Sequence, residues 1–210
     1  VVNPAALRRA DNGVARRIAA IREESFWGRF IYAPALPYSL VAGIAGGAYG
    51  AMLSLLFLVE ERGYIESAFL YFAVYTCAVV VMRIVGGRLG DRKGPIVVIP
   101  MIALSLIGSV PLVFSGSVVC LLVGALTMAL GQGSAFAVLQ AEAVKSALKE
   151  EVGKASNTFL IILDLGMFAA PIAGGFVLGT FDCSGLFAAN SLCLLAGLIV
   201  AIRTIAFRVN

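Results

Sequence analysis

The sequence has 210 residues, of which 60% are hydrophobic and 13% are charged, and its formal net charge is +4. Soluble domains usually carry about 25% charged residues, so this composition excludes an ordinary soluble domain and indicates a chain that folds in lipid. The absence of histidine removes the commonest general base and the commonest metal ligand. The four cysteines show no CxxC spacing, which favours inert thiols over a disulfide framework or a metal site.

Residues 1–35 form the first predicted unit, a cytoplasmic basic amphipathic segment. Its apolar residues recur at helical spacing, and arginines cover much of the remaining surface. Such a helix either lies in the headgroup layer on anionic lipid or is a solvated linker, and the sequence leaves both readings open. The chain starts with Val1 rather than methionine and lacks a signal-peptide pattern, so we interpret it as a fragment of a longer protein.

Residues 36–210 form the second predicted unit, an all-α bundle of six transmembrane helices. A transmembrane helix needs about 20 mostly apolar residues, and this part of the chain contains six such runs joined by short connections. The predicted spans are 36–59, 66–86, 96–114, 118–141, 155–179 and 185–206.

The distribution of cationic residues gives these spans a direction. If the N-terminal side is the inside, 15 of the 16 Lys and Arg residues fall in inside segments, and only Arg62 falls outside. Short cytoplasmic connections of membrane proteins carry such an excess of Lys and Arg. The sequence therefore predicts that both chain termini are cytoplasmic.

The stretch VGGRLGDRKGP, residues 85–95, lies between the second and third predicted spans and combines four glycines, one carboxylate and three cations. Glycine lets the chain turn sharply and lets helices approach closely. Asp91 is predicted to lie just before a helix start, where a carboxylate accepts backbone N–H bonds. Charges at this level are predicted to form a breakable cluster that locks two helices in one state and releases them in another. The residues of this predicted switch are Arg83, Gly87, Arg88, Leu89, Gly90, Asp91, Arg92, Gly94 and Glu142.

Within this stretch, GRLGDRKG (residues 87–94) resembles the signature loop of the major facilitator superfamily. The family pattern is a glycine, any residue, leucine, a small residue, Asp-Arg, any residue and glycine, and all of these match in order. Pro95 and Ile96 replace the basic pair that usually follows. In that family the loop joins the second and third helices, and a weaker copy joins the eighth and ninth.

Two further stretches indicate which half of such a transporter is present. Residues 33–63 resemble the seventh helix of bacterial efflux-type members, and residues 156–175 resemble their eleventh helix. An arginine-rich segment, which links the two halves in the family, precedes the first predicted span here. The resemblance therefore implies a C-terminal half, helices seven to twelve, whose partner is the missing N-terminal six-helix half.

Glycines are concentrated in the first predicted span, where Gly43, Gly46, Gly47 and Gly50 form two overlapping GxxxG spacings. Such spacings permit close backbone packing of membrane helices, and plain packing is one reading. The other reading is a bendable gate that presents the Tyr49 hydroxyl to a central cavity. The stretch APIAGG, which includes Pro171, Gly174 and Gly175, resembles a Gly-Pro-x-x-Gly-Gly pattern of antiporters and predicts a bend.

Asp164 lies nine residues into a run that starts near residue 155, which places it about 13 Å deep at 1.5 Å per residue. An ionisable group at that depth costs at least ~2.5 kcal/mol, so it must face a cavity or a partner. Asn157 lies seven residues earlier and shares its face. Asp164 is predicted either to take up protons or contact a cationic substrate, or to make a structural pair or a protonated hydrogen bond.

Three uncharged polar residues are further candidates for a substrate cavity. Gln132 lies on the fourth predicted span, and Tyr71 and Tyr75 lie four residues apart on the second. In the resembled family, helices of these positions approach a central cavity. The alternative is that the tyrosines belong to packing or to an interfacial aromatic belt.

These observations predict a secondary active transporter that exports a small molecule, such as a drug, sugar or metabolite, by rocker-switch alternating access. The resemblance places it in a bacterial inner membrane, with lipid and a small-molecule substrate as partners and no nucleic acid. No metal or cofactor is predicted, and the coupling species would be a proton. One alternative is a non-transporting or self-dimerising six-helix protein. A membrane-embedded enzyme is the other, but it would need a nucleophile with a base or paired aspartates, so we predict no enzymatic activity.

Overall fold

The computed structural model describes residues 31–114 and 116–209, and the side chains of all of these except 85–89 and 206–209. Most of the predicted basic segment, residues 1–35, lies outside the described residues, so its amphipathic helix stays a prediction. All the secondary-structure elements of the described chain are helices, joined by short turns. Its elements are η2 (Ala33–Ala35), α2 (Leu36–Glu61), α3 (Ala68–Lys93), η3 (Gly94–Val97), α4 (Val98–Ser109), α5 (Pro111–Phe114), α6 (Val118–Lys145) and α7 (Val152–Val209).

Four helical segments of the described chain are long and apolar enough to cross a membrane. They are Ala33–Glu61, Gly90–Phe114, Val118–Lys145 and Val152–Ile205. The apolar part of α3, Ala68–Ile84, is shorter than the others. The predicted all-α fold is therefore confirmed for the described chain, whereas the count of six crossings stays a prediction.

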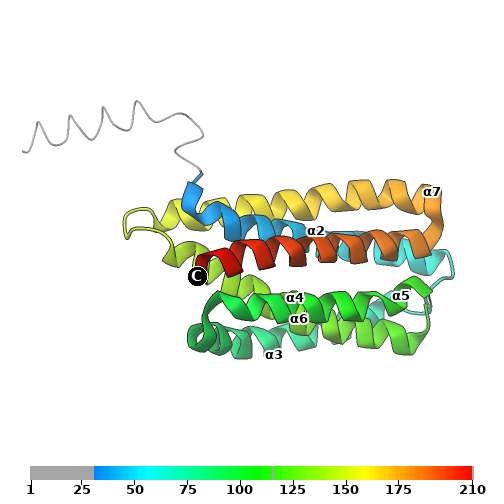
Figure 1. Cartoon of the computed structure of the whole chain (residues 1–210). Helices are drawn as coiled ribbons and strands as arrows, with labels where there is room; N and C mark the ends of the chain where they lie inside the picture. The colour runs from blue at the N-terminus through cyan, green and yellow to red at the C-terminus, as the bar shows by residue number, and fades with distance from the viewer. Residues whose placement is uncertain (1–30, 115, 210) are drawn as a thin grey trace, which may run out of the picture.

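The longest element, α7, consists of two helices. Its 58 residues would extend about 87 Å if straight, far more than a bilayer is thick. Asp182 interrupts it with non-helical backbone angles (φ 61°, ψ −171°), and the chain reverses direction there (Figure 1). We call residues 152–181 the first arm and residues 183–209 the second arm.

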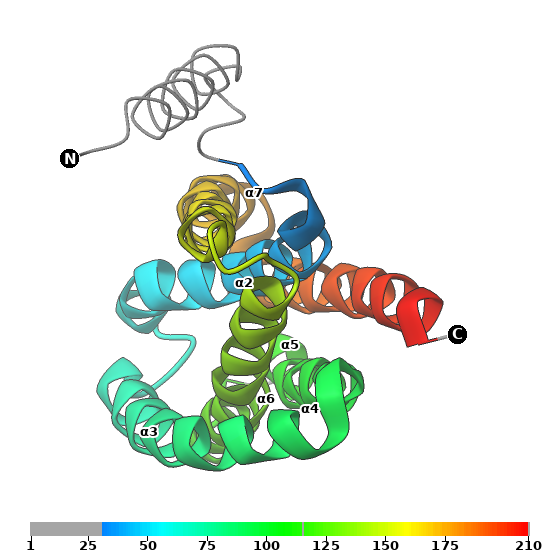
Figure 2. The same ribbon diagram turned by 90° about the vertical axis from the view of Figure 1, so that its left-hand side faces the viewer.

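The helices form two layers. In the upper layer of Figure 2, α2 lies between the two arms of α7 and packs against α7 more extensively than against any other described element. In the lower layer, α6 packs against both α3 and α4. Two clusters of buried apolar side chains fill the bundle, one around Met52 and Phe187 and the other around Ile102 and Phe159.

Close backbone contact is a main feature of the packing of α2 against the first arm of α7. A methyl group on Gly43 would stand 2.7 Å from the carbonyl oxygen of Ile162, and one on Gly166 would collide with the backbone of Gly43. One turn further on, a methyl group on Gly47 would approach the Cβ of Ala170 to 3.2 Å. Small residues allow the two backbones to approach this closely. Such close packing matters in a membrane, because lipid tails supply no hydrophobic force that would drive helices together.

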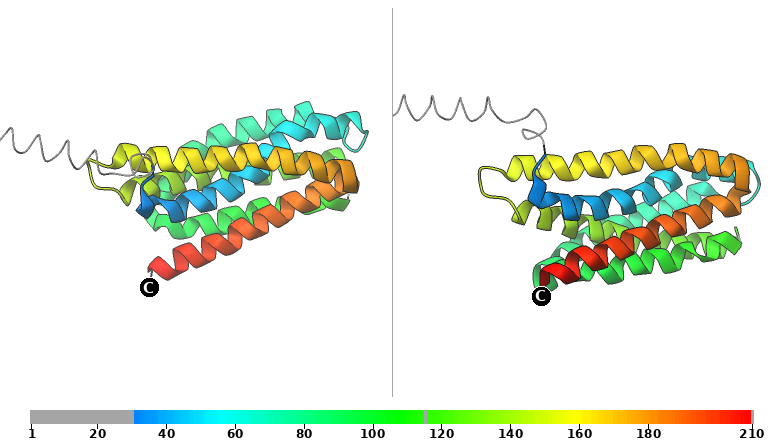
Figure 3. Two further views of the ribbon diagram at one scale, coloured as in Figure 1. Left: turned by 90° about the horizontal axis from the view of Figure 1, so that it is seen from above. Right: turned by 45° about the horizontal axis from the view of Figure 1, so that its top comes forward.

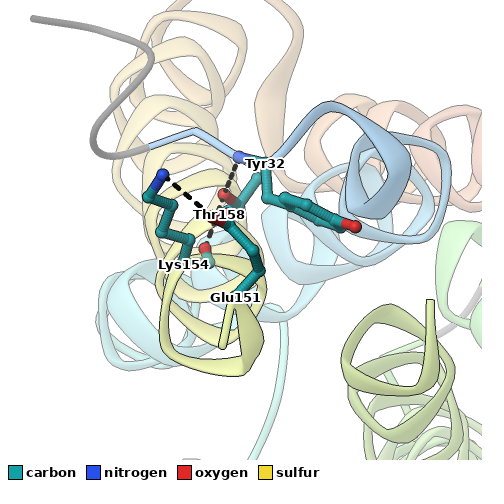
Figure 4. Close-up of polar contacts among 4 residues, drawn as sticks. All are labelled: Tyr32, Glu151, Lys154 and Thr158. Carbon is teal, nitrogen blue, oxygen red and sulfur yellow. Dashed lines mark hydrogen bonds and ion pairs between the residues drawn. The ribbon is translucent and has the colours of Figure 1, made fainter. Parts of the chain in front are cut away.

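One end of the bundle holds the start of α2, the α3–α4 and α6–α7 connections and the C-terminal end (Figures 1 and 3). Figure 4 shows how the chain is fixed there before α2 begins. The Tyr32 N–H donates to Thr158 Oγ1 at 2.8 Å, and the Tyr32 hydroxyl donates to the Ser146 carbonyl at 3.3 Å. Beside them, Lys154 pairs with Glu151 at 3.3 Å. These bonds tie residue 32 to the end of α6 and the start of α7.

The opposite end is held by side chains that reach backbone carbonyls. The Tyr64 hydroxyl lies 3.0 Å from the carbonyl oxygen of Leu112, and it also accepts a bond from Ser184 Oγ at 3.2 Å. Arg62 donates to the Leu178 carbonyl at 2.7 Å. A cation at this position satisfies one of the free carbonyls in the last turn of the first arm and complements its dipole.

The glycine-rich stretch is not the sharp turn that the sequence predicts. The second predicted span ends at residue 86, but α3 continues to Lys93, and the left-handed Gly94 (φ 69°) ends it. Asp91 lies in the last turn of α3, so its predicted place before a helix start is wrong. Packing explains the longer helix, since Gly90 is buried against Val138 of α6, where a methyl group would approach a methyl carbon to 2.7 Å.

The backbone contact between α2 and α7 makes a testable prediction. Gly166→Ala should destabilise the protein by about 1–3 kcal/mol, because the added methyl group forces the two backbones apart. Unfolding of the purified protein in mixed detergent micelles measures this change. Gly175→Ala is the matched control, because Gly175 lies in the same arm with open space around its Cα. It should be neutral or stabilising by up to ~1 kcal/mol, and equal losses for both variants would contradict the packing argument.

Candidate functional site

Three tyrosines from α2 and α3 form one aromatic group inside the bundle. The rings of Tyr49 and Tyr75 stack with centroids 5.2 Å apart, and those of Tyr75 and Tyr71 stack at 6.0 Å. Tyr71 is 1% exposed and its hydroxyl donates to the sulfur of Met128 at 3.2 Å. This burial argues against a place for Tyr71 in an interfacial belt, whereas half-buried Tyr49 forms the open side of the group.

Gln132 of α6 contacts α2 one helical turn before Tyr49, and so lies close to this group. Its Nε2 donates to the carbonyl of Ala45 at 3.0 Å, and Ala45 precedes Tyr49 by four residues. The side chain is fully buried, and its Oε1 has no hydrogen-bond partner among the described residues. This amide therefore offers one free acceptor beside the tyrosine group.

Arg83 belongs to the same neighbourhood. It lies two turns after Tyr75 on α3 and is close enough to both Tyr49 and Tyr75 to interact with them electrostatically. The sequence places Arg83 in the cytoplasmic charge cluster. The structure adds a second environment for this cation, at the edge of the tyrosine group.

The remaining members of the predicted switch are arranged differently from the expected cluster. Asp91 and Arg92 are both exposed in the last turn of α3. Glu142 pairs with Lys145 of its own helix at 2.9 Å, and Asp91 interacts electrostatically with that lysine. Lys145, which lies one turn after Glu142, thus adds an electrostatic interaction between the ends of α6 and α3. The side chains of Arg88 and Leu89, and the surroundings of Gly87, lie outside the described part of the chain.

Asp164 and Asn157 lie apart from the tyrosine group. Both are exposed on the first arm of α7, on the face that they were expected to share. The Asp164 carboxylate makes no hydrogen bond or ion pair with any other described residue. The structure therefore yields two separate candidate regions, one between α2, α3 and α6 and one on the surface of α7.

The predicted bend residues lie within the first arm, which stays helical through Pro171. Gly174 lies where α2 and the second arm meet, since a methyl group there would be 2.9 Å from Leu55 and 3.1 Å from Leu186. Gly175 faces open space. Gly174 thus occupies a helix crossing, and Gly175 does not.

The sequence interpretation missed Asn190 of the second arm. It is 4% exposed, and neither Nδ2 nor Oδ1 has a hydrogen-bond partner among the described residues. An unsatisfied buried polar group costs about 1–3 kcal/mol, so such a residue calls for an explanation. The available signal was its position as the single asparagine of the last predicted span, residues 185–206.

Neither candidate region resembles a metal centre, since the described residues contain no group of three His, Cys, Asp or Glu side chains that could hold an ion. Comparison with known proteins identifies the chain more directly. The family model of the Major Facilitator Superfamily matches residues 25–208. No curated protein matches the sequence.

This family consists of membrane transporters rather than enzymes, and its match covers nearly the whole bundle of apolar helices. The signature-like stretch at residues 87–94 lies inside the matched region. The chain is therefore an integral membrane protein that belongs to the Major Facilitator Superfamily.

Proposed function

We propose that this chain is one six-crossing half of a secondary transporter that exports a small molecule in exchange for protons. The family match supports transport in general. The observation that carries the proposed coupling is Asp164, an acid in the middle of a membrane helix without a partner in the described chain. The other half of the transporter is the missing partner in this proposal.

The position of Asp164 supports a role at the midplane of the bilayer. It follows Val152, the first residue of α7, by 12 residues (164 − 152). At 1.5 Å per residue it therefore lies roughly 18 Å along the first arm, near the centre of a hydrocarbon layer that is about 30 Å thick. A carboxylate that faces lipid there costs at least ~2.5 kcal/mol, so its exposed face is the one that a cavity or another protein surface covers.

The same arm also exposes large apolar side chains, which lipid or another protein surface must cover. Leu165, Phe168 and Ile172 are 63%, 75% and 78% exposed. An arm with both a midplane acid and bulky apolar residues suits an interface with a second bundle that surrounds a small aqueous cavity. Two bundles that rock about a midplane site provide alternating access in this kind of transporter.

The charges at the ends of α3 and α6 are suited to tuning such a motion. The Glu142–Lys145 pair is exposed on the lysine side, and Asp91 acts on it from the neighbouring helix. Exposed ion pairs contribute about 0–1 kcal/mol, so this group biases two states of similar energy rather than locking one of them. The sequence motif and the observed contacts both support this role.

The proposed coupling is tested by Asp164→Asn in the intact transporter, reconstituted in liposomes. We expect transport driven by a proton gradient to fall at least tenfold, since the amide takes up no proton, while downhill exchange of substrate persists. Substrates are found first by screening the wild-type protein across a panel of small molecules with and without a pH gradient.

Asp182→Asn is the matched control, because Asp182 is an exposed acid at the reversal of α7 rather than at the midplane. This variant should transport like the wild type. Gradient-driven transport that survives in Asp164→Asn, with a wild-type amount of folded protein, would remove the coupling role from this residue.

The proposed orientation is tested by labelling single cysteines with a membrane-impermeant maleimide in intact cells, in a background without the native cysteines. Glu61→Cys should react from outside, because it lies at the end of the bundle opposite to the basic connections. Arg92→Cys and Lys149→Cys should react only after permeabilisation. Labelling of Arg92→Cys and Lys149→Cys from opposite sides would rule out the six-crossing topology.

A further inference from the structure

A small cavity lies where α2 meets both arms of α7. Figure 3 shows α2 running between these two arms. Its volume is about 150 Å³, and its walls consist almost entirely of small apolar residues. It adjoins a wider apolar groove of about 460 Å³, with which it shares Gly47, Ala170, Ala173 and Cys193. No charged residue lines either space.

Asn190 is the polar exception in the wall of this cavity. The polar residues next to it on the second arm are satisfied within the protein. Ser191 bonds to Ser109 at 2.9 Å, and the Cys193 thiol donates to the carbonyl of Ile44 at 3.1 Å. Asn190 is more buried than either of them, yet its donor and its acceptor both lack partners in the described chain. Its amide is thus available to a molecule in the cavity.

We propose that this cavity binds an uncharged, ring-sized molecule that carries a carboxamide or lactam group. A primary carboxamide or a lactam presents one N–H donor and one C=O acceptor side by side, which is the complement of the free Oδ1 and Nδ2 of Asn190. The remaining walls are apolar and suit a hydrocarbon ring, and an apolar protein cavity of about 150 Å³ is large enough for benzene. The absence of charge in the lining disfavours ions.

This site is separate from the proposed transport function, since it uses neither Asp164 nor the tyrosine group. A ligand in it touches α2 and both arms of α7 at once. Because it binds only where these three helices are assembled, it should stabilise the bundle in proportion to its concentration.

The test measures binding to the intact transporter in lipid nanodiscs by isothermal titration calorimetry. The probes are benzamide, N,N-dimethylbenzamide, which has no N–H donor, and ethylbenzene, which has neither group. We expect benzamide to bind about tenfold more tightly than either of the other two, because only it makes both hydrogen bonds. Asn190→Leu should weaken benzamide binding about tenfold and leave ethylbenzene binding unchanged.

Two further variants complete the test. Ala173→Phe fills both the cavity and the groove and should abolish binding of all three probes. Gln140→Leu removes an exposed amide on α6 and should change nothing. Equal affinities of the wild type for the three probes would overturn the proposal and would mean that the cavity holds only water. This comparison uses the wild-type protein alone, so it does not depend on whether a variant folds. Unchanged benzamide binding in a folded Asn190→Leu protein would overturn it as well.

Discussion

The approach of two glycine-bearing backbones, α2 and the first arm of α7, is the constraint on which the upper layer of the bundle depends. Gly43 and Gly166 face one another so closely that neither position has room for a methyl group. Membrane helices gain little from burying apolar side chains against one another, so short-range packing of this kind supplies much of their association. The contact also fixes which side chains of α7 remain outside, and Asp164 is one of them.

The two candidate regions follow from this arrangement. Because α2 turns one glycine face toward α7, its opposite side carries Tyr49 toward α3, where the ring stacks on Tyr75. The tyrosine group thus forms on the α3 and α6 side, with a free acceptor from Gln132 and the cation of Arg83 nearby. The acid remains on the opposite side of the glycine contact. If the chain is one half of a proton-coupled transporter, as proposed above, a transport cycle that uses both regions needs the second half to bring substrate and proton together.

Apolar run length was enough to predict the helical class and most helix positions from the sequence, since lipid requires continuous helices with internally bonded backbones. The end of α3 was misjudged because glycines suggest turns, whereas burial of Gly90 against α6 is a tertiary effect that no local pattern reveals. For the same reason Asp91 was assigned to a cap that does not exist. The unpartnered amide of Asn190 was not predictable, because a single asparagine in an apolar span reveals nothing about its neighbours.

The bonds of Tyr32 have a mechanical consequence for whatever precedes α2. This residue forms hydrogen bonds with Ser146 at the end of α6 and with Thr158 near the start of α7, so it is bonded to both sides of the α6–α7 connection. A force applied to the preceding segment, for instance by attachment to a membrane surface or to another domain, is transmitted directly to the relative position of these two helices. The two bonds of Tyr32 therefore couple the position of the chain just before α2 to the first turns of the arm that bears Asp164.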